Sequence, residues 1–227
     1  MRLAIVSRDP ARLRKHLGTI RRYRASLSKR PEIVIALGGD GTFLAAERIF
    51  PAVPKLLVRE QSICNKCDWD NLDEGIKRLL AGAFTVQAFG KLRVRADGRT
   101  LEAVNDVVLR NASPTEAIRF TLQVNGKRIG GEWIGDGIVV ATAFGSEGYF
   151  RSITRQHFEE GIGLALNNTT RAHGPLLLDA QARIVVRLTR GQAHVAVDNH
   201  PELLVLREGG RLTITTSRDA ARIVRLR

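Results

Sequence analysis

Hydrophobic and polar positions follow one repeat up to about Phe89 and a different one beyond it. The first part predicts a strand at 3–7, a helix at 11–28 that Pro31 ends, and a five-residue apolar run at 33–37. An unbroken apolar run of this length is typical of a parallel strand that is buried on both faces. Further elements are expected as a helix at 42–50, a strand at 53–58 and a helix at 72–81. This order of strands and helices predicts a small doubly wound α/β unit with a parallel sheet.

Beyond Phe89 the pattern is that of β-strands. Asp97-Gly98 is a type I′ hairpin signal between a strand at 92–95 and a returning strand that reaches Arg110. Strict alternation at 118–124 is followed by Asn125-Gly126, a second hairpin signal. Further strands are expected at 138–141, 184–188, 194–197, 203–206 and 212–216. This half is predicted to be an all-β, antiparallel sandwich.

These patterns divide the chain into three expected parts. They are an α/β domain at 1–88, a β-sandwich domain at 89–217, and a segment at 218–227 that returns to the first domain. With 227 residues, 44% hydrophobic and 26% charged, the composition is that of a globular protein. No apolar run approaches the roughly 20 residues that span a bilayer, and the start has too short an apolar stretch for a signal peptide. We therefore expect a cytoplasmic protein without a membrane partner.

The charge is strongly basic, because 36 Lys and Arg residues face 23 Asp and Glu residues, giving +13. Such a chain attracts polyanions. Basic residues gather in only one segment, 12–30, and the solvated face of a helix is favoured over a binding surface as its explanation. Aromatic residues are only 5% of the chain, which is few for stacking on bases, so no specific nucleic-acid partner is expected.

The sharpest local motif lies between the apolar run at 33–37 and the next helix. It consists of Gly38, Gly39, Asp40, Gly41 and Thr42. Glycines let backbone N–H groups approach an anion, the following helix points its positive end there, and Thr42 can cap that helix. An ordinary glycine-rich turn has no need of Asp40. A site that only binds an anion would not favour it either, because its carboxylate repels the anion. Asp40 is explained if it binds a metal or accepts a proton from a hydroxyl that is being phosphorylated.

Two further motifs lie in the β half. Asn105-Asp106 interrupts an apolar strand, so these polar groups either face a ligand or mark a bulge or a strand end. The segment 135–152 is a strand entered by Asp136-Gly137 and left by a turn of Gly, Ser and Thr, with Tyr149 behind it. Small polar residues beside an aromatic residue suit a nucleotide pocket.

Together, in this order and spacing, the three motifs resemble those of the NAD kinase family. The first motif, GGDGT, is intact, and the second has Asp106 where the family has Glu. The third motif matches at Asp136, Gly137, Thr142, Gly145, Ser146, Tyr149 and Ser152. Asp198-Asn199 stands where the family has a late Asp-Gly. The resemblance covers about residues 3–217 and implies an α/β domain, a β-sandwich and a chain end that returns to the first domain.

The resemblance also implies an activity, namely phosphoryl transfer from ATP or polyphosphate to the 2′-hydroxyl of the NAD adenosine ribose, with Mg²⁺ or another divalent cation. Asp40 would act on that hydroxyl, and Gly38, Gly39, Gly41 and Thr42 would form the turn for the donor phosphates. Asn105 and Asp106 would hold adenosine, and Asp198 would lie near the transferred phosphate. Asp136, Gly148, Tyr149 and Ser152 would line the rest of the dinucleotide pocket. A homodimer or homotetramer is expected, and no dedicated metal ligands are assigned.

The sequence departs from the family at two places. Phe144 and Glu147 replace small residues of the third motif, and both substitutions fit a nucleoside contact better than a phosphate contact. Phe144 packing into the sandwich core is the alternative. The segment 59–69 lacks the glycines and the phenylalanine of the family, and its Cys64 and Cys67 form a C-x-x-C pair that is explained by reduced thiols, a redox pair or a shared zinc site.

Two other functions are compatible with parts of this pattern. A GGDGT-type kinase for a lipid or another hydroxylated acceptor would share the first motif, but it would not need the third. A non-catalytic nucleotide binder would use the basic surface, but it would not need Asp40. The motifs together therefore favour an NAD kinase.

Overall fold

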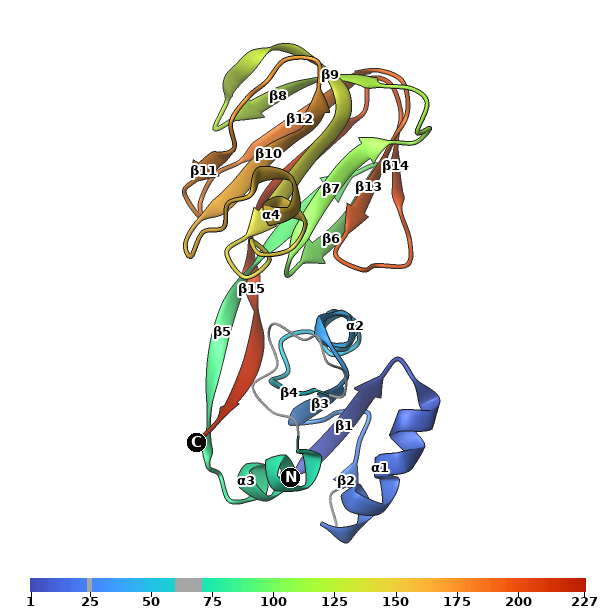
Figure 1. Ribbon diagram of the computed structural model, residues 1–227, viewed down its shortest axis with the longest axis vertical. Helices are drawn as coiled ribbons and strands as arrows, with labels where there is room; N and C mark the ends of the chain where they lie inside the picture. The colour runs from blue at the N-terminus through green and yellow to red at the C-terminus, as the bar shows by residue number, and fades with distance from the viewer. Residues whose placement is uncertain (24–25, 60–70) are drawn as a thin grey trace. The chain divides into compact units, whose positions relative to one another are not determined.

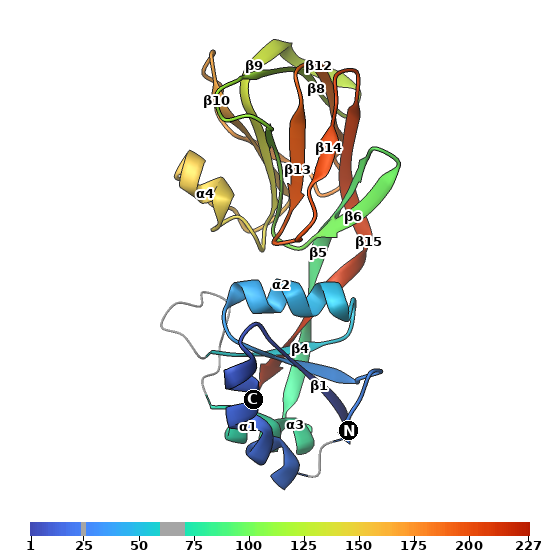
Figure 2. The ribbon, with the colours of Figure 1, turned by 90° about the vertical axis from the view of Figure 1, so that its right-hand side faces the viewer.

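The chain forms two compact units, which are described separately (Figures 1 and 2). Unit 1 consists of residues 1–89 and 220–227, and unit 2 consists of residues 90–219. The computed structural model describes residues 1–23, 26–59 and 71–227. Cys64 and Cys67 lie outside these residues. No helix in the described ranges is long and apolar enough to cross a bilayer.

Unit 1 is built on a parallel sheet. Its strands are β1 (Arg2–Ser7), β2 (Ser26–Leu27), β3 (Ile33–Leu37), β4 (Lys55–Val58) and the last part of β15 (Arg211–Leu226). They lie in the order β15–β4–β3–β1–β2, and each neighbouring pair is parallel. The helices of this unit are α1 (Pro10–Arg22), α2 (Asp40–Ile49) and α3 (Leu72–Leu80).

Alternate residues of β3 pack against helices on opposite faces of this sheet. Ile35 belongs to the hydrophobic cluster that contains Ile76 of α3, whereas Ala36 belongs to the cluster that contains Ala46 of α2. Figure 2 shows α2 on one face and α1 and α3 on the other. All five residues of β3 are buried, as the unbroken apolar run predicted. The predicted doubly wound unit is thus confirmed.

Two predictions about the helices of unit 1 are wrong in detail. The helix predicted at 11–28 ends at Arg22, and Ser26–Leu27 pairs with β1 as a strand, so Pro31 does not end the helix. The helix predicted from Thr42 begins at Asp40, with Gly39 as its N-cap and no side-chain cap. Thr42 is therefore buried in the first turn and does not cap the helix.

Unit 2 is a β-sandwich with one short helix. Its strands are the end of β5 (Phe84–Ala96), β6 (Arg99–Ala103), β7 (Asp106–Asn111), β8 (Ile118–Val124), β9 (Lys127–Thr142), β10 (Ile162–Thr169), β11 (Leu176–Leu178), β12 (Ile184–Arg190), β13 (Ala193–Val197), β14 (Leu204–Leu206) and the first part of β15. The helix is α4 (Tyr149–Thr154).

The long strand β9 belongs to both sheets of the sandwich. Its first half pairs with β8, in the sheet β9–β8–β12–β15–β5–β6. Its second half pairs with β7 and β10, in the sheet β11–β10–β9–β7–β13–β14. Side chains of both sheets form one hydrophobic core, which includes Phe120 of β8 and Ile138 of β9. The predicted β-sandwich is thus confirmed.

Both predicted hairpins are present. Asp97 and Gly98 have φ of 49° and 70°, and Asn125 and Gly126 have φ of 52° and 81°. Positive φ at both central residues is what a type I′ turn requires. The strand expected to run from the first turn to Arg110 is instead divided into β6 and β7, with a break at Val104-Asn105. That break positions the second sequence motif.

Candidate active site

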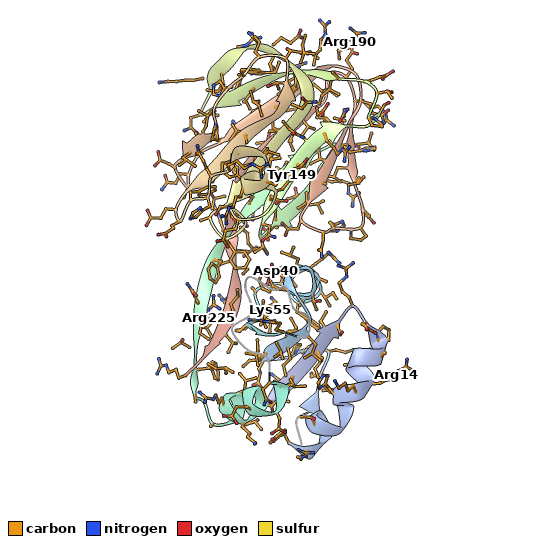
Figure 3. The ribbon with its side chains drawn as sticks, in the orientation of Figure 1. Arg14, Asp40, Lys55, Tyr149, Arg190 and Arg225 are labelled. Carbon is orange, nitrogen blue, oxygen red and sulfur yellow. The ribbon has the colours of Figure 1, made fainter. Side chains whose placement is uncertain are left out.

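The GGDGT turn of unit 1 joins the end of β3 to α2 (Figure 3). Gly38 has a φ of 148°, and a Cβ at this position would lie 2.4 Å from Oγ1 of Thr42. Both the backbone conformation and the close approach therefore require glycine. The N–H of Thr42 donates to the carbonyl of Gly39 at 2.9 Å, and Asp40 is half-buried at the first helical position. The turn thus presents one carboxylate beside backbone N–H groups at a helix N-terminus.

A buried ion pair fixes α2 to the neighbouring strand. Glu47 of α2 and Lys55 of β4 are 3% and 0% exposed, and their side chains are in direct contact. The ammonium group of Lys55 also donates to the carbonyl of Phe50 at 2.6 Å, and the N–H of Ala52 donates to Glu47 at 3.1 Å. Since every charge here has a partner, this pair has a structural role and holds the helix that carries Asp40.

In unit 2, the side chain of Asp198 organises the break between β6 and β7. Its carboxylate accepts three consecutive backbone N–H groups, from Val104 at 2.7 Å, Asn105 at 2.8 Å and Asp106 at 3.1 Å. Asp198 itself has a φ of 48°, a conformation that aspartate tolerates better than most residues. The carboxylate therefore serves as a hydrogen-bond anchor for the Asn-Asp motif.

Asp106 lies in an environment that opposes its ionisation. Burial and the negative charge of Asp198 raise the pKa of Asp106 to about 7, while the backbone N–H of Tyr149 opposes this rise. Burial also raises the pKa of Asp198, against the three N–H groups and the nearby charge of Lys91. A carboxyl group with a pKa near 7 can either donate or accept a hydrogen bond at neutral pH.

The third motif is hydrogen-bonded directly to the second. Oγ1 of Thr142 donates to the carbonyl of Val104 at 2.6 Å and accepts the N–H of Gly145 at 3.0 Å. The N–H of Thr142 donates to the carbonyl of Asn105 at 2.9 Å. A Cβ on Gly145 would lie 2.2 Å from the same carbonyl oxygen, so only glycine fits there. The two motifs are therefore one packed structure.

The short helix α4 begins beside Asp106. Gly148 is its N-cap, and a Cβ there would lie 3.8 Å from Oδ2 of Asp106. The hydroxyl of Tyr149 accepts from Nδ2 of Asn167 at 3.3 Å, and Oγ of Ser152 donates to the carbonyl of Tyr149 at 2.7 Å. Tyr149 is 39% exposed, so its ring is accessible.

Other predicted residues lie farther along the same unit. Asp136 accepts from Nδ2 of Asn168 at 3.0 Å. Asp106 is paired with Ala141, so Asp136 lies five residues along β9, roughly 17 Å away at about 3.4 Å per residue. Phe144 is 8% exposed, whereas Glu147 is exposed. The structure thus brings Asn105, Asp106, Gly148, Tyr149 and Asp198 together and leaves Asp136 apart from them.

Sequence reasoning missed three residues that contact or influence the predicted site residues. Asn167 and Asn168 hold Tyr149 and Asp136, and Lys91 acts on Asp198. Two polar residues at the end of the apolar run 162–166 were the available signal for the asparagines. Within the described ranges, no three His, Cys, Asp or Glu side chains are grouped to hold a metal ion.

The fold and these clusters define a class: an α/β unit with an anion-suited glycine turn, combined with a β-sandwich that carries a buried carboxylate pair. A sequence model of the ATP-NAD kinase C-terminal domain matches residues 104–226. The NAD kinase of Gemmatimonas aurantiaca is 30% identical over 208 residues, covering 86% of this chain and 68% of that protein. The NAD kinase of Methanopyrus kandleri is 28% identical over 209 residues, covering 88% and 74%. The chain belongs to the NAD kinase family, as the three motifs predicted.

Two solved structures have the same fold. An NAD kinase from Archaeoglobus fulgidus in complex with ATP has a TM-score of 0.81 at 19% identity, covering 98% of this chain and 93% of that chain. A yeast NADH kinase complexed with NADH has a TM-score of 0.77 at 16% identity, covering 86% and 63%. The family does not favour the lipid kinase or the non-catalytic nucleotide binder as the function.

Proposed function

We propose that this chain phosphorylates the 2′-hydroxyl of the adenosine ribose of NAD to give NADP. The observation that carries the proposal is the GGDGT turn, in which Asp40 starts α2 and glycine is required at Gly38. The family of the chain and the ligands named for the two solved relatives support this acceptor and ATP as the donor. Polyphosphate remains the alternative donor.

In the proposed reaction, the 2′-oxygen of the ribose attacks the terminal phosphorus of the donor. The bond between that phosphorus and the bridging oxygen of the donor breaks, and the hydroxyl proton passes to the carboxylate of Asp40. Backbone N–H groups of Gly39 and Gly41 stabilise the negative charge of the donor phosphates. Thr42 contributes by closing the turn, because its own N–H donates to the carbonyl of Gly39. Asp40 thus accepts the proton next to N–H groups that bind phosphate.

In unit 2, the Asn-Asp motif recognises the nucleoside. Asn105 offers both a donor and an acceptor, and Asp106 offers either one according to its protonation. Tyr149 contributes an accessible ring and a hydroxyl, and Ser152 of the same helix lines the rest of the dinucleotide pocket. Asp136, which lies apart on β9, is not assigned to this pocket. Asp198 acts on adenosine through the backbone of Asn105 and Asp106, because its carboxylate already accepts their N–H groups.

A divalent cation fits the proposed site, because Asp40 is a half-buried carboxylate beside a turn that suits phosphate. Mg²⁺ is commonly held by one or two carboxylates together with substrate phosphates, so Asp40 and the donor would hold it without a dedicated group of side chains. The ion would neutralise part of the charge of the transferred phosphate. A cytoplasmic location and a homodimer or homotetramer are further proposals, which cell fractionation and sedimentation test.

An endpoint assay tests the proposed function. The purified chain is incubated with NAD, Mg²⁺ and either ATP or polyphosphate, and NADP is measured with an NADP-specific dehydrogenase. We expect NADP with at least one donor and none without Mg²⁺. If no NADP forms with either donor, while circular dichroism shows a folded protein, the proposal is wrong.

A further inference from the structure

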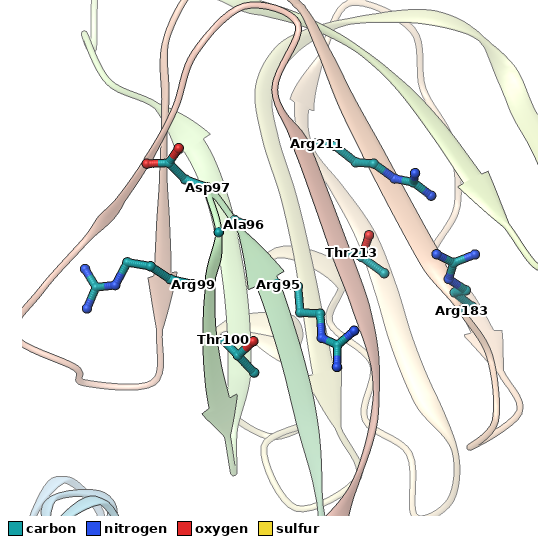
Figure 4. A pocket seen from close by; sticks show the side chains of 9 residues that line it. Arg95, Ala96, Asp97, Arg99, Thr100, Arg183, Arg211 and Thr213 are labelled. Atoms are coloured by element: carbon teal, nitrogen blue, oxygen red, sulfur yellow. The ribbon is translucent and has the colours of Figure 1, made fainter.

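A second site lies on the outer face of the sandwich, and its lining includes none of the residues assigned above. It is a cleft of about 460 Å³ formed by the β5–β6 hairpin, the first residues of β15 and the approach to β12 (Figure 4). Four arginines contribute to its lining, namely Arg95, Arg99, Arg183 and Arg211. This volume lies within the range of about 300–1,000 Å³ that is usual for small-molecule sites.

Arg95 and Arg211 face outward because of the strand alternation. Val94 and Ala96 of β5 and Leu212 and Ile214 of β15 are buried in the core. The residues between them, including Arg95 and Thr213, therefore lie on the opposite face of the sheet. Since β15 pairs with both β5 and β12, the cationic positions lie on adjacent strands.

Three of these guanidinium groups, those of Arg95, Arg183 and Arg211, have no carboxylate partner within the described part of the chain. On β6, Glu102 lies opposite Arg93 and binds it, whereas the residue opposite Arg95 is Thr100. Arg211 lies directly opposite Arg187, an arrangement of like charges that destabilises a sheet unless an anion binds there. Arg183 is also exposed, and the ion pairs among the described residues do not include it. This face thus carries concentrated, unneutralised positive charge.

The remaining charges of the cleft lie apart from these three. Arg99 binds Glu202 at 2.6 Å. Asp97 is the one carboxylate among the lining residues. In Figure 4, Asp97 and Arg99 extend to one side, while Arg95, Arg183 and Arg211 extend to the other with Thr213 among them. An anion beside the three arginines would therefore meet donors from three neighbouring segments.

We propose that this cleft binds a short phosphate chain, either free inorganic oligophosphate or the triphosphate part of a nucleotide. Guanidinium groups bind phosphate oxygens through paired N–H donors, and Thr213 adds a hydroxyl. No aromatic side chain lines the cleft, so the ligand is recognised by its phosphates and not by a base. A second copy of this face is excluded as the partner, because like charges would repel. The inference does not depend on the proposed NAD kinase activity, since the two sites share no residue.

Isothermal titration of the full chain with tripolyphosphate, and separately with ATP, tests the site. The double variant Arg95→Gln/Arg211→Gln removes two of the three unpaired charges without removing a core side chain. We expect it to bind tripolyphosphate roughly tenfold more weakly or worse, because charge-assisted hydrogen bonds to two arginines are lost. The matched control is Arg207→Gln, which changes an exposed arginine in the turn after β14 and should bind as the native chain does.

The activity assay separates this site from the proposed active site. NADP formation by the double variant should remain within about twofold of the native value, since neither arginine belongs to the proposed active site. Unchanged tripolyphosphate affinity in the double variant would overturn the proposal. A variant that binds ATP more weakly but binds tripolyphosphate as the native chain does would also overturn it, because that result would indicate recognition of the nucleoside. The native chain can also be titrated with a single-stranded oligonucleotide. If it binds tightly and the double variant does not, the proposal is overturned and the face is a nucleic-acid surface.

Discussion

Asp198 and Asp106 are joined by two reciprocal hydrogen bonds. The carboxylate of Asp198 accepts the N–H of Asp106 at 3.1 Å, and the carbonyl of Asp106 accepts the N–H of Asp198 at 3.0 Å. The side chains of both are acidic and lie close enough for the charge of Asp198 to raise the pKa of Asp106. One residue therefore fixes both the position and the ionisation of the other, which leads to the first two predictions.

Asp198→Asn should lower stability and weaken NAD binding together. The amide oxygen can still accept from Asn105 and Asp106, but the amide nitrogen then faces the N–H of Val104, now at 2.7 Å from the carboxylate. Leaving one buried N–H without an acceptor costs about 1–3 kcal/mol. Urea unfolding and the KM for NAD measure the two effects. Asp179→Asn, at an exposed turn, is the control, and an unaltered unfolding midpoint in Asp198→Asn would contradict the anchoring role.

Asp106 should make the protein less stable as the pH rises. Its pKa is raised from 3.8 to about 7 in the folded chain, so the folded state holds a proton that the unfolded state releases. The stabilising contribution is complete below about pH 4 and is lost as the pH rises through about 7. Asp106→Asn should therefore be more stable than the native chain at pH 8 but not at pH 4. Urea titrations across this range measure it, and parallel curves for the two proteins would show that Asp106 is not the cause.

Gly145→Ala should disrupt the packing of the third motif against the second. The new methyl group would lie 2.2 Å from the carbonyl oxygen and 2.4 Å from the Cα of Asn105, so the backbone must move. We expect a loss of about 1–3 kcal/mol in unfolding free energy and a higher KM for NAD. Gly174→Ala is the matched control, because nothing lies within 4 Å of its Cβ position. Equal melting temperatures for the two variants would argue against this close approach.

Asp40→Asn should abolish most of the chemistry while leaving NAD binding intact. If Asp40 accepts the proton of the acceptor hydroxyl, its loss should lower kcat by about 10²–10⁴. Steady-state kinetics measures kcat, and equilibrium titration measures the affinity for NAD. An Asp40→Asn enzyme with nearly native kcat would exclude this role, and Asp219→Asn on the exposed part of β15 controls for the change of charge.

Phe144→Ala distinguishes a stacking role from a packing role. If the ring stacks on a base of NAD, its removal should weaken binding by about 1 kcal/mol or more, and Glu147→Ala should weaken it less. The ring is 8% exposed, so it must also contribute to packing. Titration with NAD and thermal unfolding are compared for the same variant. A lower melting temperature with native affinity would assign Phe144 to packing alone.

The sequence predicted elements whose apolar pattern is strong. The run 33–37 became a strand buried on both faces, and the alternation at 118–124 gave buried residues at every second position. In contrast, α4 and β10 were not predicted. α4 has only six residues and no helical period to detect, while its N-cap, Gly148, has no side chain to signal a helix start.

Long-range contacts account for what the sequence could not reveal about the site. The motif predicts Asp198 near the transferred phosphate, and it does not reveal that the carboxylate accepts N–H groups more than 90 residues earlier in the chain. The same applies to Asn167 and Tyr149, which are brought together by the pairing of β9 and β10. Motif spacing carries no information about such partners. The backbone groups that Asp198 binds have no residue-specific signature, and the contact between Asn167 and Tyr149 depends on strand pairing.

The β15 strand supplies the parallel partner of β4, through Ile223 opposite Lys55, although the other strands of this parallel sheet lie within the first 58 residues. During synthesis on the ribosome, the sheet of unit 1 must therefore wait for this strand until all of unit 2 has been translated. The edge of β4 stays open for that whole interval, while the sandwich needs no residue beyond 219. Vectorial translation thus favours a folding order in which the second unit matures before the first is closed.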